Sequence, residues 1–214
     1  MLNDFCYSTY ARFETESRAQ GAALMGGDHL IGDIYTLEPE LQEDRSYRIW
    51  LVNRFGAKVA FLAANEEHRI LSLQARGWTL RALLSFVALG QDSIGYWGEV
   101  VLLCNDPHYN QEFDAFALNL RELMAQGIRP AVDFTEQAAR QIIDSKGTWL
   151  PSDRVGSPRI GKDSILVKTH RSASEKLIEA GRQKNKGCYT ATIIIWVVVA
   201  VALIAGVAKL LGLF

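Results

Sequence analysis

Residues 47–62 read YRIWLVNRFGAKVAFL, and this stretch carries the clearest β-hairpin pattern in the chain. Tyr47 to Val52 is rich in aromatic and β-branched residues, which favour strands. Asn53-Arg54-Phe55-Gly56 has the composition of a tight turn, and Lys58 to Leu62 is apolar again. The stretch therefore predicts two antiparallel strands joined by a short turn.

Further elements are predicted on both sides of this hairpin. Strands are expected at Leu30 to Leu37, Trp78 to Val87 and Gly98 to Leu103, with a short helix from Asn65 to Ala75 that Arg76-Gly77 ends. Apolar residues at helical spacing predict a helix from Gln111 to Gln126, closed by Gly127. An Asp133-x-x-Glu136 capping box opens a further helix to about Ser145. The fold class is therefore α+β.

The segment from Gly147 to Gly187 is predicted to be a linker, because it is poor in apolar residues. It contains a possible short strand, Ile165 to Lys168, and a second capping box, Ser172 to Glu175, that opens a basic helix to about Gln183. Residues 146–187 contain 10 Lys and Arg against 4 Asp and Glu, whereas residues 1–145 contain 12 against 20. An acidic body is thus followed by a basic tether.

The last part of the chain predicts a transmembrane helix. Ile193 to Ala208 is an unbroken apolar run, and Lys209 is the single charge between Thr190 and Phe214. About 20 apolar residues span a bilayer. The basic residues before the span are Lys176, Arg182, Lys184 and Lys186, and by the positive-inside rule they predict a cytoplasmic body. We expect a tail-anchored, single-pass protein with membrane lipid as one partner, and no cleaved signal peptide.

The sequence contains no pattern that indicates catalysis. There is no nucleophile elbow, phosphate-binding loop or dinucleotide fingerprint. The four histidines are scattered, and the three cysteines, Cys6, Cys104 and Cys188, form no ligand or disulfide spacing. The paired acids Glu43-Asp44 and Glu66-Glu67 are typical of a solvated face. We therefore expect no enzyme activity, no cofactor and no metal.

One group of motifs is more specific than composition. It consists of Gly32-Asp33, Glu38-Pro39, Asn53-Arg54-Phe55-Gly56, Val59 to Leu62 and Gly77-Trp78. In this order the motifs resemble the HIRAN domain over about residues 20–104. The resemblance implies a small β-barrel and, as in HIRAN domains attached to DNA-repair helicases, a pocket for the 3′ end of a single strand. The expected organisation is an N-terminal segment (1–20), a HIRAN-like barrel (21–105), a helical extension (106–146), a basic linker with a juxtamembrane helix (147–187) and an anchor (188–214).

The resemblance places a candidate nucleic-acid site on the central hairpin and the loop before it. Its residues are Asp44, Arg45, Tyr47, Arg48, Arg54 and Lys58. Arginine and lysine would neutralise phosphates, and Tyr47 would stack on a base. The alternative is that these basic residues are simply the exposed positions of a hairpin. The excess of eight acids in the body favours the corresponding alternative function, a tail-anchored protein-interaction or scaffolding module without nucleic-acid binding.

Overall fold

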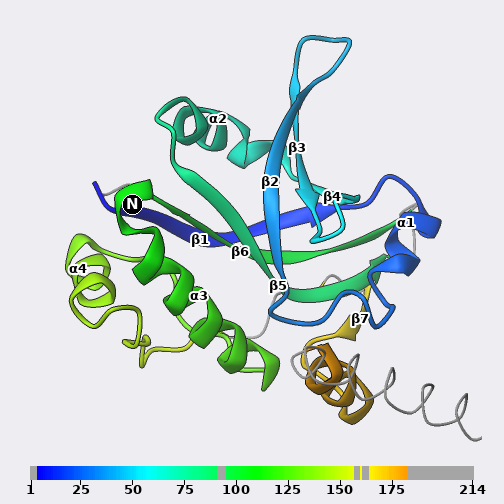
Figure 1. Cartoon of the computed structure of the whole chain (residues 1–214). Helices are drawn as coiled ribbons and strands as arrows, with labels where there is room; N and C mark the ends of the chain where they lie inside the picture. Colours follow the sequence, from blue (N-terminus) through cyan, green and yellow to red (C-terminus); the bar gives the residue numbers. More distant parts are fainter. Residues whose placement is uncertain (1–3, 91–94, 157–159, 161–163, 183–214) are drawn as a thin grey trace, which may run out of the picture. The chain divides into compact units, whose positions relative to one another are not determined.

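The computed structural model describes residues 4–90, 95–156, 160 and 164–182, and the chain divides into two compact units, Met1–Arg171 and Ser172–Phe214. The first unit is mixed α+β (Figure 1). Its strands among the described residues are β1 (Cys6–Glu14), β2 (Ile34–Leu41), β3 (Tyr47–Val52), β4 (Lys58–Leu62), β5 (Thr79–Gly90), β6 (Tyr96–Asn105) and β7 (Ser164–Lys168). Their order in the sheet is β2-β3-β4-β1-β6-β5-β7, and neighbouring strands are antiparallel.

The sheet is closed on itself by a second partner of β2. This strand pairs with β3 over most of its length, while its first residues, Ile34 to Thr36, pair with β5. Six ladders therefore link β2, β3, β4, β1, β6 and β5 in a ring, and β7 is added outside it along β5.

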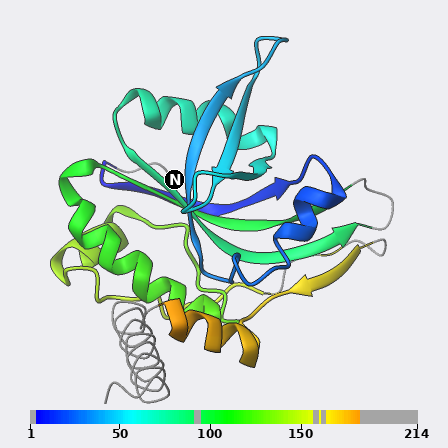
Figure 2. The same ribbon diagram turned by 45° about the vertical axis from the view of Figure 1, so that its right-hand side comes forward.

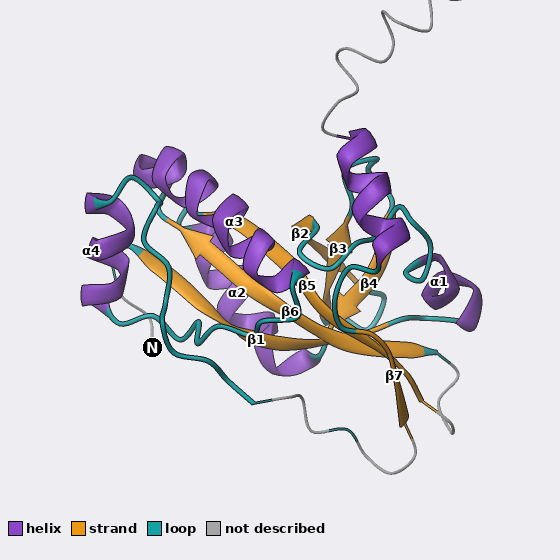
Figure 3. Cartoon of the chain, turned by 90° about the horizontal axis from the view of Figure 1, so that it is seen from below, coloured by secondary structure: helices purple, strands orange, loops and turns teal. Residues whose placement is uncertain are grey.

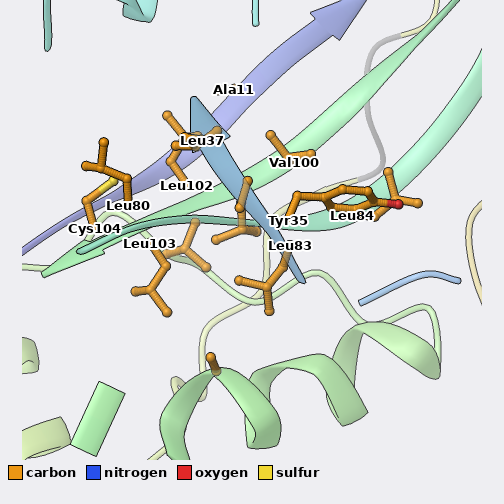
Figure 4. Close-up of a cluster of buried hydrophobic side chains, with 14 of the residues drawn as sticks. Ala11, Tyr35, Leu37, Leu80, Leu83, Leu84, Val100, Leu102, Leu103 and Cys104 are labelled. Carbon is orange, nitrogen blue, oxygen red and sulfur yellow. The ribbon is translucent and has the colours of Figure 1, made fainter. Parts of the chain in front are cut away.

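The helices cover the strands on two sides. They are α1 (Arg18–Ala23), the 3₁₀ turns η1 (Ala64–Glu66) and η2 (Pro107–Tyr109), α2 (Glu67–Ala75), α3 (Asn110–Ala125) and α4 (Glu136–Asp144). Figures 1 and 3 show α3 and α4 on one side of β1, β6 and β5, with α2 on the other. Because the side chains of successive strand residues point to opposite sides of the sheet, Leu102 and Leu103 lie on opposite faces of β6. Figure 4 shows Leu83 and Leu103 directed toward the α3 side, and Leu37 and Leu102 away from it.

The predicted central hairpin is confirmed, together with its turn. The backbone N–H groups of Phe55 and Ala57 both donate to Asn53 Oδ1 at 2.9 Å. Gly56 adopts a φ of 79°, a conformation that other residues enter only at a cost. The register then pairs Trp50 with Phe61 and Leu51 with Ala60.

The predicted helices are also present, with one correction. The long apolar stripe forms α3, and it buries Phe113, Phe116 and Leu120. The Asp133 capping box is wrong: α4 begins two residues later, and Thr135 is the residue whose side chain accepts a hydrogen bond from the N–H of Ala138. Asp133 and Thr135 both belong to the residue types that cap helices, so the sequence alone left the choice open.

Two segments that the sequence analysis set outside the barrel belong to the sheet. Residues 6–14 form β1, which lies between β4 and β6 and pairs with β6 along its whole length. Residues 164–168, expected within a linker, form β7 along β5. The first compact unit accordingly extends to Arg171 and includes the predicted helical extension.

The second unit begins with the predicted capping box. The N–H of Ser172 donates to Glu175 Oε2 at 2.9 Å, and the N–H of Glu175 donates to Ser172 Oγ at 3.3 Å. Residues 173–182 are helical, and this helix carries Lys176 and Arg182. Lys184, Lys186 and the predicted span lie outside the described residues. No helix in the described ranges combines the length and apolar character needed to cross a membrane.

Candidate functional site

The six candidate residues lie on β3, at the start of β4 and in the turns at the two ends of β3. The hairpin of β2 and β3 projects beyond the remaining strands (Figure 2). Asp44 and Arg45 lie in its turn, and Tyr47 and Arg48 begin β3. Arg54 and Lys58 lie at the other end of β3, in the next turn and at the start of β4. At about 3.3 Å per residue, the length of β3 separates the two groups by roughly 17 Å. The candidates therefore form two groups.

The β2–β3 turn places a non-glycine residue in a left-handed conformation. Arg45 has a φ of 66°, and its N–H donates to the carbonyl of Gln42 at 3.1 Å. Asp44 supports the turn because its Oδ1 accepts from the N–H of Ser46 at 2.9 Å and from the Ser46 hydroxyl at 2.7 Å. These hydrogen bonds, led by the hydroxyl, lower the pKa of Asp44. Asp44 is thus a turn-forming carboxylate that stays ionised at neutral pH.

Three of the four candidate cations are already paired with acids. Arg48 pairs with Glu16. Lys58 Nζ lies 2.6 Å from Glu40 Oε1, and Arg54 lies 3.9 Å from Asp28 Oδ1. In each pair the carboxylate neutralises a positive charge that would otherwise be available to bind a phosphate.

Glu40 links a cation and an aromatic side chain. It accepts hydrogen bonds from Lys58 and, at 2.6 Å, from Trp50 Nε1. The Lys58 bond, followed by the Trp50 bond, lowers the pKa of Glu40. Trp50 itself is only 5% exposed, so it is a packed residue.

The cations also cover aromatic rings. The Arg48 guanidinium lies 4.6 Å from the centroid of the Phe61 ring, and Arg54 lies 4.6 Å from that of Phe55. Lys58 lies 5.4 Å from the Trp50 ring. Tyr47, the residue predicted to stack on a base, is 39% exposed. Among the six candidates it is the one aromatic side chain, and it is accessible.

A groove opens beside the first group of candidates. Its volume is about 710 Å³, and it lies between the β2–β3 turn, the starts of β3 and η1, and the end of β4. Its lining includes Asp44, Tyr47 and Arg48 from the candidate set, together with Glu14, Glu43, Ile49, Phe61, Leu62 and Glu67. We call this the hairpin groove. Arg45, Arg54 and Lys58 do not line it.

Sequence reasoning missed most of the acidic lining of this groove. Glu43 and Glu67 stood out as members of paired acids, which were assigned to a solvated face. Glu67 Oε1 accepts the backbone N–H of Tyr47 at 2.9 Å, so α2 holds the start of β3. Glu14 reaches the same place from β1. Nothing in local sequence spacing brings these three carboxylates together.

A second, smaller cavity of about 240 Å³ lies where β5, β7 and the segment after α3 meet. Arg129 in its wall donates to Ser85 Oγ at 2.9 Å and to Glu99 Oε2 at 2.7 Å. Its guanidinium also lies 4.4 Å from the centroid of the Tyr10 ring. Burial raises the pKa of Tyr10 to about 12. The charged group at this cavity is therefore compensated within the fold.

Comparison of the chain with protein-family models, curated proteins and solved structures found no match. The resemblance to the HIRAN domain therefore stays a prediction. Within the part of the chain whose positions are described, no group of three His, Cys, Asp or Glu side chains has the arrangement of a metal site.

Proposed function

We propose that this chain is a membrane-anchored binding module that recognises a segment of a partner protein through the projecting β2–β3 hairpin and the hairpin groove. The observation that carries the proposal is the charge of this region. Four carboxylates line the groove, of which Glu14 pairs with Arg12, and the one guanidinium among the lining residues, on Arg48, pairs with Glu16. Such a surface attracts cationic protein groups and repels phosphates.

Exposed apolar side chains on the same hairpin support protein recognition. Leu41 and Tyr47 are cross-strand partners next to the turn, and they are 59% and 39% exposed. Aromatic side chains that combine an apolar ring with a polar end are enriched at the centres of interfaces. The hairpin thus presents contact area beside an acidic groove.

A second candidate function, binding of single-stranded nucleic-acid ends, is favoured by the other end of β3. Phe55 is 66% exposed there, and Arg54 lies over its ring. A cation beside an accessible ring is the combination that holds a single strand. The ring of six strand ladders supports a small closed barrel, whereas its HIRAN-like character, from which this function was inferred, is a prediction. The pairing of Arg54 and Lys58 with Asp28 and Glu40 weakens it.

The membrane anchor remains part of the proposal, with the apolar run from Ile193 to Ala208 as the span and the body in the cytoplasm. Protease added to sealed right-side-out vesicles should leave the body intact. Replacement of Lys176, Arg182, Lys184 and Lys186 by Gln should reduce binding to anionic lipid or scramble orientation. Digestion of the parent body from outside would contradict the predicted topology.

The two functions can be separated with the full chain in phosphatidylcholine nanodiscs, whose lipid carries no net charge. A displayed random-peptide library is selected on these discs after depletion on empty discs, and short single-stranded DNA is titrated at two salt concentrations. We expect selected peptides that lose binding to Leu41→Ser and Tyr47→Ser variants. Salt-sensitive DNA binding without peptide selection would overturn the proposal in favour of the second candidate.

A further inference from the structure

We propose that the segment bound in the hairpin groove is a short peptide rich in lysine or arginine. This inference rests on the proposed function and adds the chemistry of the partner. The groove volume of about 710 Å³ falls within the range of roughly 300–1,000 Å³ that is usual for ligand pockets. A site of this size receives a short linear segment.

Acidic side chains outnumber basic ones in the lining of the hairpin groove. Glu14, Glu43, Asp44 and Glu67 line the groove, and Arg48 is the single cation among the lining residues. Glu14 is paired with Arg12. Arg48 pairs with Glu16 outside the lining, and its charge adds to the hydrogen bonds that lower the pKa of Asp44. The lining nevertheless holds four carboxylates against one guanidinium. A bound peptide that carries positive charge would complement this excess of carboxylates.

Arg48, the cation in the groove lining, contacts both an aromatic ring and a carboxylate. The Arg48 guanidinium lies 4.6 Å from the centroid of the Phe61 ring, and it also pairs with the Glu16 carboxylate. The wall of the groove therefore already stabilises one cation between a ring face and a carboxylate. Tyr47 is 39% exposed and offers a second ring, and it lines the groove together with Asp44 and with Glu67, which accepts a hydrogen bond from its backbone N–H. A lysine or arginine of the partner that packs on the Tyr47 ring would contact the same two kinds of group, an aromatic ring face and a carboxylate.

Apolar side chains form the floor of the hairpin groove. Ile49 and Leu62 are buried, and Phe61 is half-buried. The aliphatic stems of lysine and arginine pack on apolar surface while their charged ends reach out to acidic groups. A basic segment thus matches both the floor and the rim of the groove, whereas an acidic or phosphorylated segment matches the floor alone.

The test uses the full chain in phosphatidylcholine nanodiscs and two labelled octapeptides, Lys-Leu-Lys-Ala-Lys-Leu-Lys-Ala and the same sequence with Glu at each Lys. Fluorescence anisotropy should detect binding of the lysine peptide only, with affinity that falls as salt is raised. In the variants, Glu43→Gln and Glu67→Gln remove charge, and the amide introduced by the second substitution keeps an oxygen for the Tyr47 N–H. Each should weaken binding about twofold to fivefold at low salt, as exposed ion pairs do. Asp144→Asn, at an acid at the end of α4 that is exposed like Glu43, is the matched control and should change nothing.

Each outcome of this experiment decides the inference. Equal binding of the glutamate peptide, or lysine-peptide binding that Glu43→Gln and Glu67→Gln leave unchanged, would overturn it. If the library selection yields hairpin-dependent peptides that are neutral or acidic, protein recognition stands and the basic-segment inference fails. If no peptide of any charge is selected, both fail.

Discussion

Lys168, the last residue of β7, provides a sharp test of how the edge of the fold is held. The side chain is 7% exposed. Its Nζ donates to the carbonyl of His29 at 2.7 Å and to those of Leu24 and Gly26 at 3.3 Å. The ammonium thus joins the outer strand to the loop between α1 and β2. The perturbation is Lys168→Met, which keeps the length and apolar stem of the side chain and removes its donors.

The expected loss of stability follows from these three hydrogen bonds. A bond to a charged group contributes about 1.5–3 kcal/mol, and the two longer ones are weaker, at roughly 0.5 kcal/mol each. Part of this loss of stability is offset because the methionine variant no longer pays the desolvation cost of burying an ammonium group. The net expectation is a decrease of about 3 kcal/mol in the free energy of unfolding. At roughly 2–4 °C per kcal/mol for a chain of this size, Tm falls by about 6–12 °C.

The assay is tryptophan fluorescence of the full chain in mild detergent during thermal and urea unfolding. Lys146→Met, at an exposed position, serves as the control and should leave Tm unchanged. Lys168→Arg keeps a cation and should recover part of the loss. If Lys168→Met unfolds within about 0.5 kcal/mol of the parent, the carbonyls of the loop do not depend on the ammonium and the reasoning is refuted.

Three further predictions concern single positions. A Cβ at Gly98 would meet the carbonyl oxygen of Phe86 on the paired strand, so Gly98→Ala should lower Tm clearly, and an unchanged Tm would show that the strands adjust freely. Arg45→Gly should raise the free energy of unfolding by about 1 kcal/mol because glycine tolerates the positive φ, and a lower stability in urea unfolding would argue against the turn geometry. Because hydrogen bonds lower the pKa of Glu40 in the folded state, their stabilisation is present above the ordinary carboxyl range and is lost as pH falls through the lowered pKa. The chemical shift of the Trp50 indole N–H should change as Glu40 is protonated at acidic pH, and this change should be absent in Glu40→Gln. If the same change is still seen in Glu40→Gln, the titrating group is a residue other than Glu40.

The parts of the fold that the sequence predicted are those built from neighbours along the chain. The Asn53 to Gly56 turn depends on side-chain and backbone groups within four residues. The Ser172 capping box closes over three residues, and the stripe of α3 follows the helical period. Even here, the choice of Thr135 over Asp133 as a cap was not determined, because both residue types satisfy the same backbone groups.

The candidate site was predicted in part. Tyr47, Arg48 and Asp44 do lie together at one groove, because they are close in sequence around one turn. Arg54 and Lys58 were grouped with them on the same hairpin, yet the extended β3 strand places them at its far end. The acidic lining was missed because β1, the β2–β3 turn and α2 each contribute to it.

The sequence by itself thus determined the local elements of this protein: the central hairpin, the long amphipathic helix and the second capping box. Their interactions span a few residues, so residue type and spacing specify them. Tertiary structure decided that residues 6–14 lie inside the sheet, that Arg48 meets Glu16, 32 residues away, and that Lys168 reaches His29, 139 residues away. These contacts depend on which strands pair and in which register, and many pairings satisfy the same alternation of apolar and polar residues. Only the burial of the whole core selects one of them.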